Sequence, residues 1–329
     1  MEKTKNKKRI KREFLTSIIE NKAFFIFLIL FIVASLLSEN FMTTQNLRNV
    51  LRQISTSAVL GFGFTIVLTA GYIDLSVGLL VSLTGVVAAM ASKIEGMPFL
   101  GAVALCIMVG IIGGILNATF ISKFSIPAFM ATLALAQGFK GASYLLSNTS
   151  TVIGLPDGFA FIGQRYVAGI PIPVIILVVV GIIFAVILHL TKFGRHVVAV
   201  GGNSEAAKVS GISLTSTCYG VFILMGICCA IASLILTGRA MAAQPAAGEG
   251  MEMDVIAAVI IGGTSLSGGH GNVVGTIFGC LVMGIINNML NLAGVNTSWQ
   301  LVAKCCIILL AMLIDVMSNY FYQKQDAKA

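Results

Sequence analysis

The sequence predicts an all-α integral membrane protein, and its composition, its apolar runs and its glycines all indicate this fold class. Of the 329 residues, 57% are hydrophobic and only 10% are charged, and the mean hydropathy is +0.97. Soluble domains carry about 25% charged residues. The apolar runs are continuous rather than alternating, which indicates helices and not the strands of a membrane barrel. The 35 glycines fit the same class, because small residues let membrane helices approach closely.

About ten transmembrane helices (8–10) are expected, some of them short or discontinuous. A helix needs about 20 apolar residues to cross the hydrocarbon, and fewer where it is broken. The segments 77–92 and 254–264 are short and bordered by glycine, so re-entrant helices in their place would leave eight or nine full crossings. The ten apolar segments are residues 23–38, 55–70, 77–92, 98–117, 126–146, 171–191, 213–237, 254–264, 271–291 and 299–318.

The basic residues predict the orientation in the membrane. Lys and Arg crowd residues 1–22, just before the first apolar segment, and cytoplasmic flanks collect such residues. We therefore expect both termini in the cytoplasm, with the loop 147–170 outside. The expected domain organisation is a basic cytoplasmic tail (1–22), one polytopic transmembrane domain (23–318) and a cytoplasmic C-terminal tail (319–329). Because the net charge of +8 is concentrated beside a membrane span, we expect lipid and no nucleic acid as a partner.

No pattern for a cofactor, a metal or nucleotide hydrolysis is found. The seven cysteines lie within apolar runs without the spacing of disulfides or metal ligands, and the three histidines are scattered. No G-x-x-x-x-G-K-[ST] motif occurs, so any ATPase must be another polypeptide. We expect a protein that is not an enzyme and that holds no cofactor.

A polar segment of the sequence KFGRHVVAVGGNSEAAKVSG, residues 192–211, lies between two long apolar runs. Residues 204–208 have high helix propensity and are framed by chain breakers and a helix cap. These framing residues are Gly201 and Gly202 before the helix, Asn203 or Ser204 as the N-cap, and Gly211 after it. An ordinary interhelical loop is the alternative, although a connector rarely needs so many residues. The pattern predicts a short cytoplasmic helix that presents a surface to a soluble partner.

Three motifs carry a resemblance to a known family. They are GYIDLSVG at residues 71–78, GR followed by AVGGNSEAA and SGI within residues 194–212, and DVIAAVIIGGTSLSGGHG at residues 254–271. In this order they resemble the ribose-type sugar permeases of ATP-binding cassette importers, in the branched-chain amino acid and sugar permease superfamily. The resemblance covers about residues 20–318, and departures such as Tyr72, Met251 and His270 leave open which sugar is carried.

The resemblance implies a subunit of the bacterial cytoplasmic (inner) membrane that translocates a monosaccharide inward by alternating access. Ribose leads, ahead of other monosaccharides and autoinducer-2. The implied partners are a second permease copy, cassette ATPase subunits and an extracytoplasmic sugar-binding protein.

The assembly that the resemblance implies therefore contains a homodimer of permeases, two ATPases on the cytoplasmic side of the membrane and one binding protein on its outer side.

The resemblance also assigns the polar segment to docking on the ATPase. The residues that match the family's docking loop are Gly194, Arg195, Gly201, Gly202, Asn203, Glu205, Ala206, Ala207 and Gly211. Polar residues beside glycine breaks or on one helix face are the candidates for the translocation pathway, because broken helices expose backbone to a cavity. These candidates are Gly71, Asp74, Ser76, Gly78, Thr264, Ser265, Asn287 and Asn291.

Structural alternatives exist for each pathway candidate. Asp74 can serve as the N-cap of the next helix, and the asparagines can form interhelical hydrogen bonds. Residues 71–78 and 262–269 match at four positions at an offset of 191, which is either an internal repeat or chance. Lys140 and Lys304 fall within apolar spans, where each can snorkel or neutralise an acid.

The alternative function is a secondary transporter or channel for a small polar solute that works without ATP. Such a carrier needs ion-coupling groups within its spans, and Asp74 alone is a small set. The scarcity of charged residues in the spans also favours a neutral substrate over an ion-coupled one.

Overall fold

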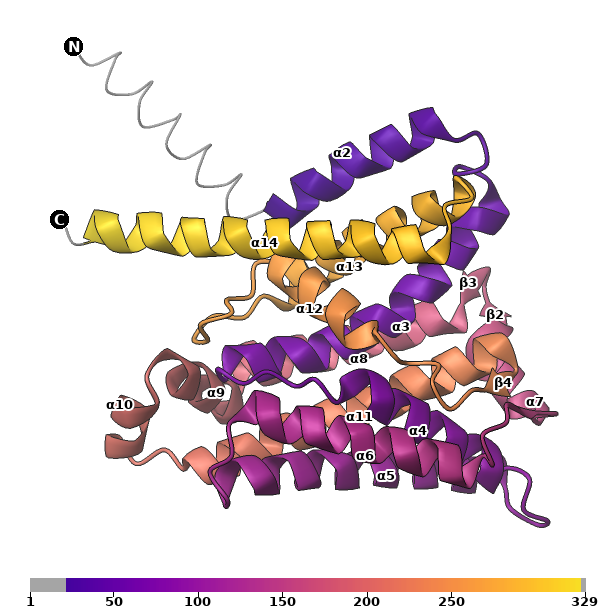
Figure 1. Ribbon diagram of the computed structural model, residues 1–329, viewed down its shortest axis with the longest axis horizontal. Helices are drawn as coiled ribbons and strands as arrows, with labels where there is room; N and C mark the ends of the chain where they lie inside the picture. Colours follow the sequence, from indigo (N-terminus) through magenta and orange to yellow (C-terminus); the bar gives the residue numbers. More distant parts are fainter. Residues whose placement is uncertain (1–21, 327–329) are drawn as a thin grey trace.

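The chain forms a bundle of long helices with short helices or strands at each end (Figure 1), and the computed structural model describes residues 22–326. The helices are α2 (Lys22–Leu37), α3 (Thr44–Thr69), α4 (Val77–Ala91), α5 (Phe99–Ser122), α6 (Ala128–Leu146), α7 (Asp157–Gln164), α8 (Ile172–Leu190), α9 (Lys192–Gly202), α10 (Ser204–Val209), α11 (Leu214–Ala240), α12 (Met251–Ile261), α13 (Val273–Leu292) and α14 (Thr297–Asp326). Each of the ten apolar segments expected from the sequence coincides with one helix, so the helical membrane class is confirmed.

Within residues 22–326, five helices are long and apolar enough to cross a membrane: α3, α5, α8, α11 and α13. Three shorter apolar helical segments accompany them, at residues 23–37, 77–91 and 297–310. Helix α3 begins earlier than the segment expected from residue 55, because the polar residues before that point continue the same helix. Thr43 caps its start by accepting a hydrogen bond from the backbone N–H of Asn46 at 3.4 Å.

Helices α4 and α12 are too short to cross the hydrocarbon alone. Their 15 and 11 residues correspond to lengths of about 22 Å and 16 Å, against about 30 Å of hydrocarbon. Both begin near the middle of the bundle and run towards opposite ends (Figure 1). Their starts meet at Gly78 and Gly248, where a Cβ atom on either residue would collide with the carbonyl oxygen of the other. The backbone N–H of Gly248 also donates to Ser82 Oγ at 2.9 Å.

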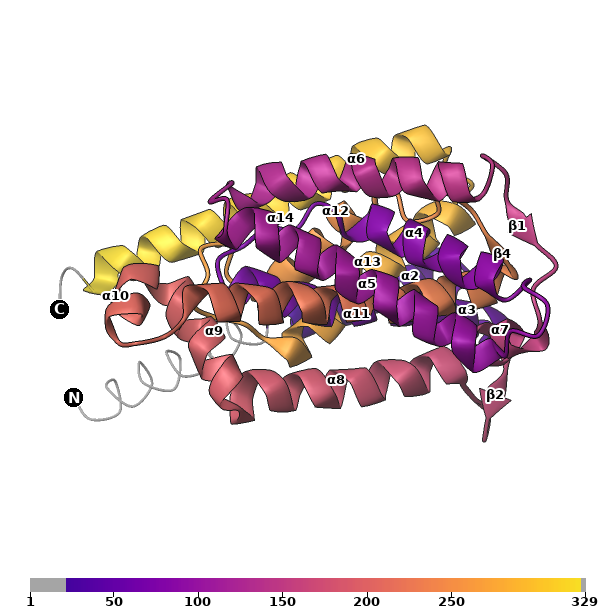
Figure 2. The ribbon, with the colours of Figure 1, turned by 90° about the horizontal axis from the view of Figure 1, so that it is seen from below.

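Helices α3 and α11 lie at the centre of the bundle, and α8 lies at its edge (Figure 2). In the most apolar part of α3, 78% of the residues are buried, and its core side chains include Phe62 and Phe64. Helix α8 is the most apolar of the five long helices, yet only 33% of the residues in its most apolar part are buried. An apolar helix with most of its surface exposed fits a position against lipid.

The two ends of the bundle differ in structure. Helices α9 and α10 lie at the same end as the start of α2 and the end of α14 (Figure 1). The opposite end carries α7 and two antiparallel strand pairs, β1 (Val152–Ile153) with β4 (Ala242–Ala243) and β2 (Tyr166–Val167) with β3 (Ile170–Pro171). The loop expected at 147–170 therefore contains a helix and short strands as well as turns.

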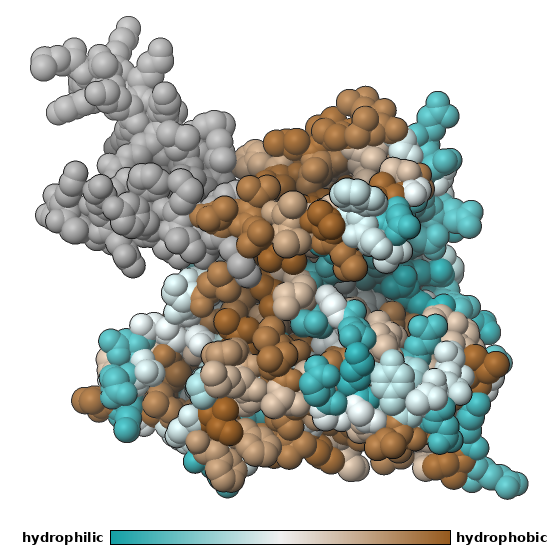
Figure 3. All heavy atoms as spheres, in the orientation of Figure 1, coloured by the Kyte–Doolittle hydropathy of each residue, from teal (hydrophilic) through white to brown (hydrophobic). Residues whose placement is uncertain are grey.

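Hydrophilic residues gather at both ends of the bundle, over a surface that is otherwise largely hydrophobic (Figure 3). A further hydrophilic group lies in the middle of the front face, between α6 and α12. Polar groups at this depth cannot be stabilised by lipid, so this group is considered below with the sites.

Candidate functional site

The polar segment 192–211 folds into two helices, α9 and α10, which form an arm at one end of the bundle. The start of α9 is capped by Thr191, whose Oγ1 accepts a hydrogen bond from the backbone N–H of Gly194 at 3.1 Å. Val197 and Val200 are buried and attach this helix to the bundle. Helix α9 was missed in the sequence, where a single short helix was expected. The spacing of Phe193, Val197 and Val200 on one helix face was the signal for it.

The second helix of the arm, α10, lies where the sequence predicted it. Of the two proposed N-caps, Asn203 is the one used, and its Oδ1 accepts a hydrogen bond from the backbone N–H of Ala206 at 3.0 Å. Gly211 follows the C-terminal end with φ of 83°, as a glycine that ends a helix does. Glu205 and Lys208 are exposed, Val209 is 87% exposed, and Ala207 is buried against the bundle. Helix α10 therefore offers a mixed polar and apolar surface.

All nine residues predicted to dock on an ATPase lie in this arm. Gly194, Arg195, Gly201 and Gly202 belong to α9, Asn203 caps α10, Glu205, Ala206 and Ala207 belong to α10, and Gly211 follows it. Gly201 and Gly202 form the last turn of α9, so the chain breaks after them, at Asn203.

The end of α9 packs backbone to backbone against two other predicted motifs. A Cβ atom on Gly201 would collide with the carbonyl oxygen of Thr69, at the end of α3. The backbone N–H of Gly269 donates to that same oxygen at 2.9 Å. Gly71 and Gly268 also lie against Gly201. We call these five residues, Thr69, Gly71, Gly201, Gly268 and Gly269, the glycine junction. It joins the arm to α3 and to the loop between α12 and α13.

Asp74 is buried in the break between α3 and α4. Its Oδ1 accepts hydrogen bonds from the backbone N–H of Ser76 at 2.8 Å and from Ser76 Oγ at 2.6 Å. Asn117 Nδ2 on α5 donates to Ser76 Oγ at 2.8 Å. The sequence allowed Asp74 to be the N-cap of the next helix, but the N-cap of α4 is Ser76, and Asp74 holds that residue in place. Asn117 was not predicted, because nothing in the sequence links it to residue 76.

The second glycine segment forms a loop that is closed by its own hydrogen bonds. Thr264 is fully buried, and its Oγ1 accepts from the backbone N–H of Asn272 at 3.2 Å. Ser265 accepts from the backbone N–H of Ser267 at 3.2 Å. Ser267 is exposed and lies in a loop, whereas Ser76, its counterpart at the offset of 191, is buried and caps a helix. The local structure is therefore not repeated at this offset.

The two candidate asparagines on α13 bond to different partners. Asn287 Nδ2 donates to Asp254 Oδ2 at 3.5 Å, and Asn291 Oδ1 accepts from Gln300 Nε2 on α14 at 3.0 Å. Asp254 also accepts from Lys304 Nζ at 2.8 Å. These interhelical bonds agree with the structural alternative for both asparagines. The expectation that Lys304 neutralises an acid is confirmed.

Lys140 on α6 also neutralises an acid, because its Nζ lies 2.7 Å from Glu249 Oε1. Glu249 belongs to the segment that leads from β4 to α12. Both side chains are partly exposed, at 30% and 54%. The acidic partners of Lys140 and Lys304 could not be predicted, because acids more than 40 residues away cannot be matched to a lysine by spacing.

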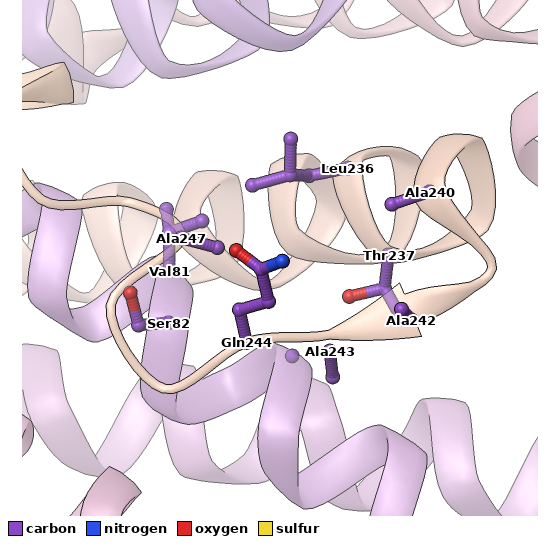
Figure 4. A pocket seen from close by; sticks show the side chains of 10 residues that line it. Val81, Ser82, Leu236, Thr237, Ala240, Ala242, Ala243, Gln244 and Ala247 are labelled. Carbon is purple, nitrogen blue, oxygen red and sulfur yellow. The ribbon is translucent and has the colours of Figure 1, made fainter. Parts of the chain in front are cut away.

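A small cavity of about 190 Å³ lies between α4, the end of α11 and the segment after β4 (Figure 4). Its polar lining comes from Ser82, Thr237 and Gln244, and the remaining lining is formed mostly by alanines. The side chain of Gln244 extends across the hollow between α4 and α11. Polar groups from three elements therefore face one hollow near the end that carries α7.

Comparison with known proteins identifies the family. Residues 46–312 match the family described as the permease component of branched-chain amino acid transport systems. The chain is 42% identical over 289 residues to the ribose import permease protein of Bacillus subtilis, covering 87% of this chain and 89% of that protein. It is 40% identical over 302 residues to the ribose import permease protein of Escherichia coli, covering 91% and 94%.

A third relative is the D-allose transport system permease protein of Escherichia coli, 36% identical over 293 residues, or 89% of this chain and 90% of that protein. No solved structure matches the chain. The three motifs and the arm lie within the matched region, which covers nearly all of the helical bundle. The chain belongs to the permease-component family of branched-chain amino acid transport systems.

Proposed function

We propose that this chain is the permease subunit of an ATP-binding cassette importer and that it moves a monosaccharide, with ribose as the first choice, into the cell. The relatives named as ribose and D-allose permeases support a sugar substrate. The observation that carries the proposal is the exposed arm α9–α10, which the glycine junction connects to α3. The chain itself performs no covalent chemistry.

The proposed topology places the arm and both termini in the cytoplasm of a bacterial inner membrane. The basic residues at 1–22 support this orientation, and the described ends of the chain lie at the same end of the bundle as the arm. Ten helices then lie within the membrane, of which α4 and α12 are too short to cross it. The predicted basic tail 1–22 lies almost entirely outside the described residues, whereas residues 319–326 of the predicted C-terminal tail belong to α14. The division into tails and one membrane domain stays a prediction.

The proposed partners are a second copy of this permease, two cassette ATPases and an extracytoplasmic sugar-binding protein. The ATPase would bind the exposed surface of α10, where Glu205 and Lys208 supply charge and Val209 supplies an apolar contact. An exposed apolar side chain among charged ones is typical of an interaction surface. The binding protein would deliver sugar at the opposite end, beside α7.

The glycine junction provides a physical route from the ATPase to the membrane helices. Backbone that touches backbone leaves no side chain to absorb a displacement, so movement of α9 must shift the end of α3 or break the contact. Residues 70–76 follow directly, and there Asp74 and Ser76 hold the start of α4. A movement of the arm would thus tilt α3 and α4 about this break and alternate the side on which the pathway opens.

The test is reconstitution of the permease in liposomes with its cassette ATPase and binding protein, followed by uptake of radiolabelled ribose. We expect uptake that requires ATP and the binding protein, with D-allose and xylose as competitors that rank its selectivity. Uptake driven by an ion gradient in the absence of any ATPase would overturn the proposal in favour of a secondary transporter.

A further inference from the structure

Four charged side chains lie together on one face of the bundle, and none of them is among the residues predicted to line the translocation pathway. Lys140 pairs with Glu249 at 2.7 Å, and Lys304 pairs with Asp254 at 2.8 Å. They come from α6, the segment before α12, α12 itself and α14. Each pair joins one cation to one anion, so the group has no net charge.

These four residues lie at membrane depth and not at the ends of the helices. Lys140 is in the interior of α6, and Lys304 lies within the apolar segment 297–310 of α14. Helix α12 begins near the middle of the bundle, so Glu249 and Asp254 lie there too. The side chains of the two pairs are 20% to 54% exposed. Ionisable groups with exposed surface at this depth face water or a partner rather than lipid.

A cavity of about 510 Å³ adjoins the charged residues. Glu249, Asp254 and Lys304 line it together with apolar side chains. The apolar lining residues are Met251, Met253, Leu301, Ile308 and Leu309. A lining of hydrogen-bonding groups opposite apolar surface suits a sugar, whose hydroxyls need partners and whose C–H faces are apolar.

We propose that this cavity is a passage site for a neutral sugar and that Glu249, Asp254 and Lys304 form its hydrogen-bonding lining, with Lys140 as the counter-charge of Glu249. This proposal rests on the proposed function and names residues for it. Paired carboxylates accept from sugar hydroxyls, and the ammonium groups donate to them. Because each charge keeps its counter-charge, a neutral polyol can bind and leave without exposing an unpaired charge to a low dielectric.

The chain supplies a reporter and a matched control for this proposal. Cys305 and Cys306 are both exposed, and the other five cysteines are buried. Cys305 lines the cavity and Cys306 does not. A charged, membrane-impermeant methanethiosulfonate reagent reaches a thiol in a water-filled passage and is excluded from hydrocarbon.

The first experiment labels the reconstituted transporter carrying either Cys306→Ser or Cys305→Ser. We expect the remaining Cys305 to react about tenfold faster than the remaining Cys306, because only the former faces water. Ribose in excess should slow the reaction at Cys305 alone. Equal rates, or no reaction at Cys305 with and without ATP, would mean that lipid or protein covers the cavity and would overturn the proposal.

The second experiment separates a role in passage from a role in folding. The double variant Asp254→Met with Lys304→Met removes one ion pair from the lining and leaves Glu249 paired with Lys140. It leaves no unpaired charge, which a fold tolerates. We expect uptake to fall about tenfold, while the midpoint of thermal unfolding and co-purification of the ATPase stay unchanged. Wild-type uptake in this variant would show that the pair is only structural and would overturn the proposal. Absence of ATP-driven uptake in the unmodified protein would instead overturn the proposed function.

Discussion

At the scale of single residues, two adjacent glycines at the end of α9 have different surroundings. Gly201 touches the backbone of Thr69 and Gly269, whereas a Cβ atom on Gly202 would meet nothing within 4 Å. Sequence patterns treat the two as equivalent chain breakers. An added side chain would therefore collide with neighbouring backbone at the first glycine only, and a substitution there tests the junction.

Gly201→Ala should weaken the glycine junction, because its new methyl group collides with backbone that cannot rearrange. Overpacking of this kind destabilises a contact by about 1–3 kcal/mol, so we expect ATP-driven uptake to fall roughly tenfold. Gly138→Ala on α6, where a Cβ atom would also meet nothing within 4 Å, is the control and should change uptake by less than about twofold. Equal effects of the two substitutions would contradict the role of the junction.

Asp74→Ala should destabilise the fold and reduce uptake, because it removes the acceptor of two hydrogen bonds to Ser76. Hydrogen bonds to a charged group contribute about 1.5–3 kcal/mol, and the unfolding transition in detergent should move to lower temperature. Asp157→Ala, at the exposed start of α7, is the control. An unchanged unfolding temperature in Asp74→Ala would show that the helix break does not depend on this carboxylate.

At the scale of elements, α10 is a short helix that depends on its N-cap more than a long helix does. Its six residues form few intrahelical hydrogen bonds, and Asn203 satisfies one of the free N–H groups at its start. Because Ala207 is its buried attachment, the other side chains are free to contact a partner.

Glu205→Lys should reduce co-purification of the cassette ATPase without affecting membrane insertion, because it reverses the charge at the exposed surface of α10. We expect the amount of bound ATPase to fall about tenfold in a pull-down from detergent. Glu95→Lys, in the exposed turn between α4 and α5, is the control with the same charge change. Undiminished binding by Glu205→Lys would remove α10 from the docking surface.

At the scale of the whole molecule, hydropathy predicts most of the fold, because apolar runs of about 20 residues have one stable arrangement in lipid. All ten apolar segments became helices. Helix α9 and the polar start of α3 were missed, since both mix charged with apolar residues. The acidic partners in the ion pairs were also not predicted. Asp254 and Lys304, for example, are brought together only by the packing of α12 on α14.

Of the candidate functional sites, only the parts in which a motif carries its own helix-capping residues could be predicted. The arm was found from its glycines, its N-cap and its polarity. The contact of Gly201 with Thr69 and Gly269 could not be found, because it depends on the relative position of three segments that are far apart in the chain. The same reason applies to the bond between Asn117 and Ser76.

The central claim is that the arm α9–α10 is a cytoplasmic surface on which a separate ATPase acts. The most direct measurement is labelling of Ser204→Cys by an impermeant maleimide in membrane vesicles of known orientation, with and without the cassette ATPase. The account predicts labelling only from the cytoplasmic face, with protection when the ATPase binds. Labelling from the outer face, or labelling that the ATPase leaves unchanged, would contradict it.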